Sequence, residues 1–302
     1  MTSSAAFTSV SENYLANARS YVDADCRRYG LPSSGPLYQN LLAYLVNPDA
    51  HDFRLGELPG LTGDPGVLSQ PRRILDLGCG PGTLVWKALR CGHDAHGIDL
   101  SEEKIALGKL WSRAMDLPAE WEGRVRIEDG GRLPYAGETF DLVTSYHVLE
   151  HVADLPSVLY EAVRVTKRGG WLELRAPDYR MSYDTHYCMA WPRFMPHAQA
   201  EKWCDAMMRP RDGIGTFYYV TGPQVISLLE SLGCRVNAVV YREHRDGRVF
   251  ASDGSITADP AIFAPDADVT AIARELLRLQ AENRLPAIYK TCLEFTIAAQ
   301  RL

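Results

Sequence analysis

The chain has 302 residues, 46% of them hydrophobic and 23% charged, a composition typical of one or two ordinary globular domains. Its formal net charge of −6 argues against a general nucleic-acid binder or an anionic-membrane binder, which would need a basic face, so we expect no nucleic acid and no membrane among its partners, although a local basic patch stays open. Seven scattered cysteines without a C-x-x-C pair, and an N-terminus without a basic start or apolar core, predict a cytoplasmic protein that lacks a disulfide framework.

The first 70 residues predict a helical lid. Residues 11–29 and 35–46 repeat apolar side chains at helical spacing, with Tyr14 and Tyr21 on one side of the first helix. Residues 47–70 are rich in Pro, Gly and Asp, which predicts a loop. An exposed N-terminal helix could be exchanged between subunits, so a homodimer stays open.

Strands and helices alternate in the rest of the chain, residues 71–302. We expect strands at residues 73–77, 95–99, 125–128, 141–145, 171–174, 234–241 and 293–299. This order predicts an α/β fold with a Rossmann-like, seven-stranded, mostly parallel sheet that has helices on both faces and an antiparallel last strand. Residues 178–220 interrupt the alternation after strand five and predict an inserted cap over a substrate pocket.

The most informative segment is residues 74–82, Ile-Leu-Asp-Leu-Gly-Cys-Gly-Pro-Gly. A short apolar strand runs into Asp76 and then into Gly78, Gly80 and Gly82. Glycine permits positive φ and a close approach of a ligand to the backbone. At the carboxyl end of a buried strand, this pattern predicts a site for a nucleotide-like molecule at the switch point of an α/β sheet.

Neighbouring acids narrow the choice of ligand. The third glycine comes one residue earlier than in the G-x-G-x-x-G pattern of dinucleotide sites. Asp76 would repel a pyrophosphate but suits an amino or sulfonium group, whereas Asp99 can bind ribose hydroxyls and Asp129 can meet an adenine amino group. An NAD-linked oxidoreductase is therefore the less favoured alternative.

Five motifs in order resemble the class I S-adenosylmethionine-dependent methyltransferases, in their small-molecule branch. They are residues 74–82, Asp99, Asp129-Gly130, residues 140–152 and Arg168-Gly169-Gly170. The resemblance is strong over residues 72–177, and it implies S-adenosylmethionine as cofactor and S-adenosylhomocysteine as product.

The resemblance also implies roles for single residues. The three glycines would pass under the methionyl and ribose parts of the cofactor, with Asp76 near its amino group and Asp99 on its ribose. At the adenine we expect Leu100, Asp129 and Gly130. Beside the transferable methyl we expect Tyr146 and His147, and in the lid over the cofactor Tyr14 and Tyr21.

The expected reaction is methyl transfer to a small organic acceptor, at a hydroxyl or carboxyl oxygen. Such an acceptor needs a base, for which His186 and His147 are the candidates. His186 could instead pack in the aromatic-rich cap. Transfer to nitrogen or carbon, and a protein that binds the cofactor without transferring methyl, remain alternatives.

Two further groups of polar residues were weighed. His147 and His151 have the spacing of metal ligands on a helix, but this Leu-Glu-His context is common in metal-free members of the family, so we expect no metal. Four cap arginines are candidates either for a substrate carboxylate or phosphate or for solvated surface: Arg180, Arg193, Arg209 and Arg211.

Overall fold

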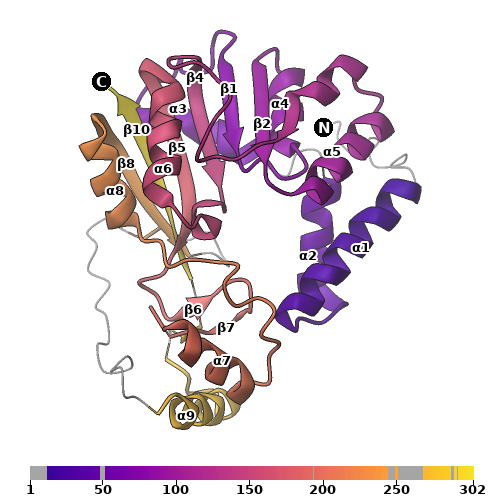
Figure 1. Cartoon of the computed structure of the whole chain (residues 1–302), viewed down its shortest axis with the longest axis vertical. Coiled ribbons are helices and arrows are strands. Elements are labelled where there is room, and N and C mark those ends of the chain that lie inside the picture. Colours follow the sequence, from indigo (N-terminus) through magenta and orange to yellow (C-terminus); the bar gives the residue numbers. More distant parts are fainter. Residues whose placement is uncertain are drawn as a thin grey trace.

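A twisted mixed sheet forms the centre of the protein in a computed structural model (Figure 1), which describes residues 12–47, 52–192, 194–243, 249–250, 268–286, 289–290 and 292–302. In this part of the chain the sheet has eight strands in the order β3 (Val125–Ile127), β2 (Asp94–Asp99), β1 (Arg73–Leu77), β4 (Phe140–Tyr146), β5 (Thr166–Asp178), β10 (Leu293–Arg301), β8 (Cys234–Glu243) and β9 (Val249–Phe250). The pairings of β1 with β2 and β4, and of β4 with β5, are parallel, whereas β10 is antiparallel to both β5 and β8. The predicted seven-stranded architecture is confirmed, and β9 adds a short pairing at its edge.

Helices cover both faces of the sheet and bury two separate cores. One core joins Leu58, Val85 and Trp111, from three helices of one face, to strand residues such as Ile74. The other core joins Leu159 and Val225 to the alternate strand positions. The helices of the first face are α3 (Asp52–Thr62), α4 (Thr83–Arg90) and α5 (Glu102–Ala114), and those of the second are α6 (Leu155–Val165) and α8 (Gly222–Ser231).

The helix boundaries follow local signals that the sequence carries. Ser101 caps α5 by accepting a hydrogen bond from the Lys104 backbone N–H, and Asp154 caps α6 by accepting one from Ser157. Thr221 caps α8 in the same way, through Gln224. Two short 3-10 turns, η2 (Ala119–Arg124) and η3 (Leu149–His151), complete this half of the molecule.

The prediction of a loop over residues 47–70 is wrong, because α3 lies there. Its composition is poor for a helix, with Pro59 inside it. The helix is stabilised by packing: Leu58 and Leu61 are buried, and so is Arg54. Tertiary burial therefore overrides the weak intrinsic propensity of this segment.

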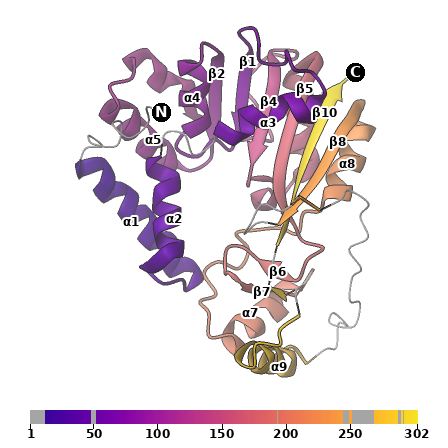
Figure 2. The same cartoon turned by 180° about the vertical axis from the view of Figure 1, so that it is seen from behind.

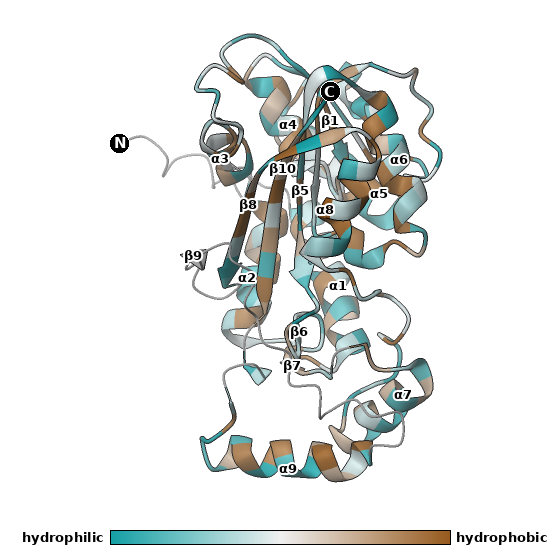
Figure 3. Cartoon of the chain, turned by 90° about the vertical axis from the view of Figure 1, so that its left-hand side faces the viewer, coloured by the Kyte–Doolittle hydropathy of each residue, from teal (hydrophilic) through white to brown (hydrophobic). Residues whose placement is uncertain are grey.

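The N-terminal helices and the cap lie at the carboxyl end of the sheet (Figures 1 and 2). Helices α1 (Glu12–Tyr29) and α2 (Gly35–Val46) pack against each other on one side. The cap contains β6 (Tyr183–Asp184), β7 (Met189–Ala190) and α7 (His197–Ala206), and α9 (Val269–Ala281) packs against α7 at the end of the molecule away from the sheet. Figure 3 shows polar and apolar residues alternating along α9, whose Val269, Ala273 and Leu276 are buried. In the described ranges no helix combines the length and apolarity that crossing a membrane requires.

Candidate functional site

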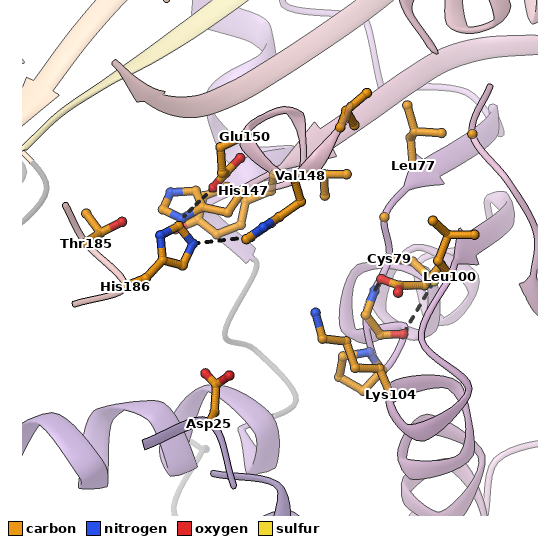
Figure 4. A pocket seen from close by; sticks show the side chains of 18 of the residues that line it. Asp25, Leu77, Cys79, Leu100, Lys104, His147, Val148, Glu150, Thr185 and His186 are labelled. Atoms are coloured by element: carbon orange, nitrogen blue, oxygen red, sulfur yellow. Dashed lines mark hydrogen bonds and ion pairs between the residues drawn. The ribbon is translucent and has the colours of Figure 1, made fainter. Parts of the chain in front are cut away.

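A cavity of about 1240 Å³ opens where β1, β2 and β4 end, between the sheet, the N-terminal helices and the cap. Because β2 and β4 lie on opposite sides of β1, this is the topological switch point of the sheet. The residues that line the cavity come from segments far apart in the chain, from α1 to the cap. Figure 4 shows part of this lining.

Backbone geometry explains the glycines that end β1. Gly78, Gly80 and Gly82 have φ of 73°, 54° and 77°, which L-residues rarely adopt. A Cβ on Gly78 would lie 2.1 Å from Cγ2 of Val148, so a side chain has no room there. Gly78 and Gly80 line the cavity. Gly82 instead starts α4, where a Cβ would lie 2.7 Å from Val125.

Asp99 connects the glycine segment to the end of β2. Its Oδ2 accepts a 2.8 Å hydrogen bond from the Gly80 backbone N–H, and its Oδ1 accepts one of 2.8 Å from Ser101. A carboxylate has about four acceptor positions, so two remain for a ligand. Asp99 lines the cavity together with Leu100, which is 70% exposed.

The expected adenine-side residues lie in the same lining. Asp129 and Gly130 follow β3 and border the cavity. The Asp129 Oδ1 also accepts a 2.8 Å hydrogen bond from the Gly131 backbone N–H, so this side chain shapes its own turn as well. The structure thus brings the ends of β1, β2 and β3 to one half of the cavity.

Asp76 and Tyr14 differ from the expectation, because neither lines the cavity. Asp76 is 2% exposed, and the Arg54 Nη2 of α3 donates a 2.8 Å hydrogen bond to it. Burial raises the pKa of the Asp76 carboxyl, while Arg54 opposes that rise. Tyr14 is fully buried and donates a 2.7 Å hydrogen bond to the Leu45 carbonyl, which joins α1 to α2. Tyr21, in contrast, does line the cavity.

Arg54 is a cavity residue that the sequence analysis missed. It lines the cavity from α3 while it also donates to Thr144 and Asp76. The sequence predicts a loop where α3 lies, so no pattern in the sequence indicates that Arg54 reaches the cavity. A guanidinium at this position places a positive charge beside the glycine segment.

The end of β4 supplies the other half of the cavity. Tyr146 and His147 both line it, with their rings stacked at a centroid distance of 4.3 Å. His147 has φ of 54°, which ends the strand, and its Nε2 lies 2.9 Å from Glu294 Oε1 of β10. Withdrawal from solvent lowers the pKa of His147, but the carboxylates of Glu294 and Glu150 outweigh it and leave that pKa raised. His147 and His151 do not share a helix face, because His151 lies in η3.

His186 is held in the cavity wall by the cap. Its Nδ1 lies 3.2 Å from Oδ2 of Asp184, a fully buried carboxylate that also accepts from the Tyr187 backbone N–H and the Tyr179 hydroxyl. The ring stacks on Phe217 with centroids 5.2 Å apart. These contacts fix both the position and the orientation of the imidazole.

His151, His186 and Glu150 form a group that we call the histidine cluster. The Nε2 atoms of His151 and His186 are 3.2 Å apart, and one ligand atom from each of the three residues lies within 4.8 Å of the others. Glu150 is fully buried, and neither of its carboxylate oxygens has a hydrogen-bond partner. Figure 4 shows Glu150, His147 and His186 pointing toward one another across the cavity.

The cap arginines have partners outside the cavity lining. Arg180 pairs with Asp178 at 2.8 Å, Arg211 pairs with Asp205 at 2.5 Å, and Arg209 donates to the Gly30 carbonyl. Arg193 lies outside the described residues. The three described arginines therefore hold protein segments in place.

Comparisons with known proteins agree with this geometry. Residues 75–174, from β1 to β5, match the family described as "Methyltransferase domain". A ubiquinone biosynthesis O-methyltransferase from Rhizobium rhizogenes is 36% identical over 98 residues, which are 32% of this chain and 38% of the relative. One from Paracidovorax citrulli is 34% identical over 127 residues, 42% of this chain and 49% of the relative.

The family match runs from β1 to the middle of β5 and ends at residue 174, before the cap. The chain spans less than half of the length of these curated relatives. Among solved structures, the PH0226 protein from Pyrococcus horikoshii has a TM-score of 0.50 at 14% identity, covering 89% of this chain and 100% of that one. At that identity the similarity concerns the fold alone.

Proposed function

We propose, on the premise that this chain carries a class I S-adenosylmethionine-dependent methyltransferase domain, that it transfers the methyl group of S-adenosylmethionine to an oxygen of a small organic acceptor. The observation that carries the proposal is one continuous cavity, with the glycine segment and Asp99 at one end and the histidines at the other. The O-methyltransferase relatives support oxygen as the acceptor atom.

We assign the cofactor to the half of the cavity formed by β1, β2 and β3. Asp99 would accept hydrogen bonds from the ribose hydroxyls, with Leu100 against the adenine and Asp129 at its amino group. Gly78 and Gly80 leave the backbone open to the ribose and the methionyl chain. The positive charge of Arg54 suits the cofactor carboxylate.

The acceptor would lie between β4 and the cap. Its hydroxyl loses a proton to an imidazole, His147 or His186, as the oxygen attacks the methyl carbon. The C–S bond breaks, and neutral S-adenosylhomocysteine leaves. The enzyme's main contribution is alignment of oxygen, methyl and sulfur, since the sulfonium is already a good leaving group.

Helices α1 and α2 would act as the lid over this reaction. Tyr21 of α1 and Leu41 and Tyr44 of α2 line the cavity opposite the sheet. They would exclude water once both ligands are bound.

Calorimetry and a product assay test this function. S-adenosylmethionine and S-adenosylhomocysteine should both bind. The affinity for NAD should be at least about tenfold weaker, which corresponds to a difference of about 1.4 kcal/mol in binding free energy. Labelled methyl should then appear on a member of a panel of phenols and carboxylic acids, detected by mass spectrometry. Tighter binding of NAD would contradict the assignment. Cofactor binding without any methylated product would indicate a binding protein, and methylated amines would move the reaction to nitrogen.

His186→Gln and His147→Gln examine the acceptor end. Each should lower kcat while the dissociation constant of S-adenosylhomocysteine stays within about twofold, because this product lacks the methyl group beside which His147 is expected and is assigned to the ends of β1, β2 and β3. A wild-type rate in both variants would remove the imidazoles from the proton transfer. His197→Gln is the matched control, because His197 is an exposed residue of α7.

A further inference from the structure

We infer that the histidine cluster, Glu150, His151 and His186, is a binding site for a divalent transition-metal ion. The sequence analysis predicts no metal, because the Leu-Glu-His context around His147 and His151 is common in metal-free members of the family that the chain resembles. The structure instead adds His186 from the cap and Glu150 from η3, and all three residues border the cavity.

The hydrogen bonds around the two imidazoles determine which ring nitrogen carries the hydrogen in each of them. His151 Nδ1 lies 2.5 Å from the Thr216 carbonyl oxygen, which can only accept, so this nitrogen carries the hydrogen. His186 Nδ1 lies 3.2 Å from the Asp184 carboxylate and donates in the same way. In the neutral rings both Nε2 atoms are then acceptors, and they lie 3.2 Å apart, a contact that is a hydrogen bond only when one of the two rings carries a second proton.

This distance matches the spacing of two ligands on one ion. Nitrogens about 2.05 Å from a metal, at an angle of about 90–109° to each other, lie roughly 2.9–3.4 Å apart. The second partners of the imidazoles, the Asp184 carboxylate and the Thr216 carbonyl, are those that orient metal-binding histidines in proteins.

Glu150 supplies an independent observation. Its carboxylate is fully buried with neither oxygen hydrogen-bonded, whereas buried carboxylates ordinarily have donors. The His147 Nδ1 is 3.9 Å from Glu150 Oε1, too far for a hydrogen bond. A cation between Glu150 and the two Nε2 atoms would compensate this charge, since one ligand atom from each of the three residues lies within 4.8 Å of the others.

Two imidazoles and one carboxylate favour zinc, iron or cobalt over magnesium, which prefers oxygen ligands and water. Three protein ligands leave a position open toward the cavity, as in catalytic rather than structural sites. What the ion does there rests on the proposed function: the acceptor oxygen would take the open position, and its proton would go to His147. The existence of the site does not depend on that reaction.

Titration with CoCl₂ tests the site directly, because bound Co²⁺ absorbs visible light according to its ligands. Purified full-length protein, treated with chelator and then dialysed, should bind one Co²⁺ per chain and exchange it for Zn²⁺. Glu150→Gln, His151→Gln and His186→Gln should each weaken binding at least tenfold. His197→Gln should leave the affinity within twofold.

Folding of the variants is checked on the same samples. Glu150→Gln keeps the shape and removes a buried charge that has no hydrogen-bond donor, so its metal-free melting temperature should stay close to that of the wild type. Added Zn²⁺ should stabilise the wild type and His197→Gln but none of the three cluster variants. S-adenosylhomocysteine should bind all variants alike, since the cofactor half of the cavity is unchanged.

Three results would overturn the site: no Co²⁺ spectrum in the wild type, equal Co²⁺ affinity in Glu150→Gln and His186→Gln, or a preference for Mg²⁺ over Co²⁺. Its failure is distinguishable from failure of the proposed function. Methyl transfer that persists in chelator without a Co²⁺ site refutes the metal alone. A Co²⁺ site in a protein that methylates no acceptor refutes the proposed reaction alone.

Discussion

Replacement of Gly78 by alanine isolates the backbone requirement at the end of β1. Two costs add at this position. An L-residue at φ of 73° is disfavoured by about 1–2 kcal/mol. The new Cβ would also lie 2.1, 2.6 and 2.9 Å from Cγ2, Cγ1 and Cβ of Val148, and a β-branched side chain cannot rotate all of these atoms away. Overpacking of this kind costs roughly 1–3 kcal/mol.

Gly78→Ala should therefore lower the free energy of unfolding by roughly 2–5 kcal/mol. Gly92→Ala is the matched control, because Gly92 has φ of 85° with nothing within 4 Å of an added Cβ. It should show only the strain, about 1–2 kcal/mol. Adding Val148→Ala to Gly78→Ala removes both Cγ atoms. The double variant should therefore lose roughly 1–3 kcal/mol less unfolding free energy than the sum of the losses in the two single variants.

Urea denaturation of the wild type, Gly78→Ala, Gly92→Ala, Val148→Ala and the double variant measures these differences, with calorimetry of S-adenosylhomocysteine on the same samples. Gly78→Ala should also weaken cofactor binding, because relief of the contact moves the backbone that lines the cavity. If Gly78→Ala costs no more than Gly92→Ala, or if the double variant is additive, the contact with Val148 does not explain the glycine.

Three other substitutions examine Asp99, Arg54 and Tyr14. Asp99→Asn should raise the dissociation constant of S-adenosylmethionine by roughly 10–100-fold, since each hydrogen bond to a charged group contributes about 1.5–3 kcal/mol; an unchanged calorimetric affinity would remove Asp99 from the ribose. Arg54→Met leaves Asp76 buried without its ion-pair partner and should destabilise the fold by about 3–5 kcal/mol in urea, with partial recovery when Asp76→Asn is added; a loss below about 1 kcal/mol would contradict the buried pair. Tyr14→Phe leaves the Leu45 carbonyl without its donor and should lower the free energy of unfolding by about 1–3 kcal/mol while the cofactor affinity stays constant. A large drop in cofactor affinity would instead indicate that Tyr14 contacts the cofactor.

The parts of the fold that were predictable from the sequence depend on short-range signals. Strand β1 has the predicted bounds, because its apolar side chains and the positive-φ glycines that follow it all act within a few residues. The end of the chain was predictable for the same reason, with β10 antiparallel in the sheet. The Ser101 and Asp154 caps likewise act within one turn of helix.

Helix α3 was missed because its stability is not local. Its own residues include glycines and Pro59, and only the burial of Leu58, Leu61 and Arg54 against the sheet accounts for it. The reassignment of Asp76 from cofactor contact to buried ion pair follows directly from that missed helix. No pattern within residues 47–70 carries this information.

The histidine cluster depends on a contact between segments far apart in the chain. His151 and His186 are separated by 35 positions, and they meet only because the cap returns over β4 with Asp184 fixing the ring. Glu150 was visible in the sequence as part of a motif. Its complete burial without a hydrogen-bond donor is a property of the folded chain alone.

The position of α9 limits how the cap of this protein can be exchanged. Because Val269, Ala273 and Leu276 are buried in the same core as Trp203 of α7, residues 178–220 do not form a self-contained unit. A chimera that receives those residues from another enzyme without α9 would leave an apolar helix face uncovered. Exchange of the whole cap therefore requires two separate stretches of the chain to change together.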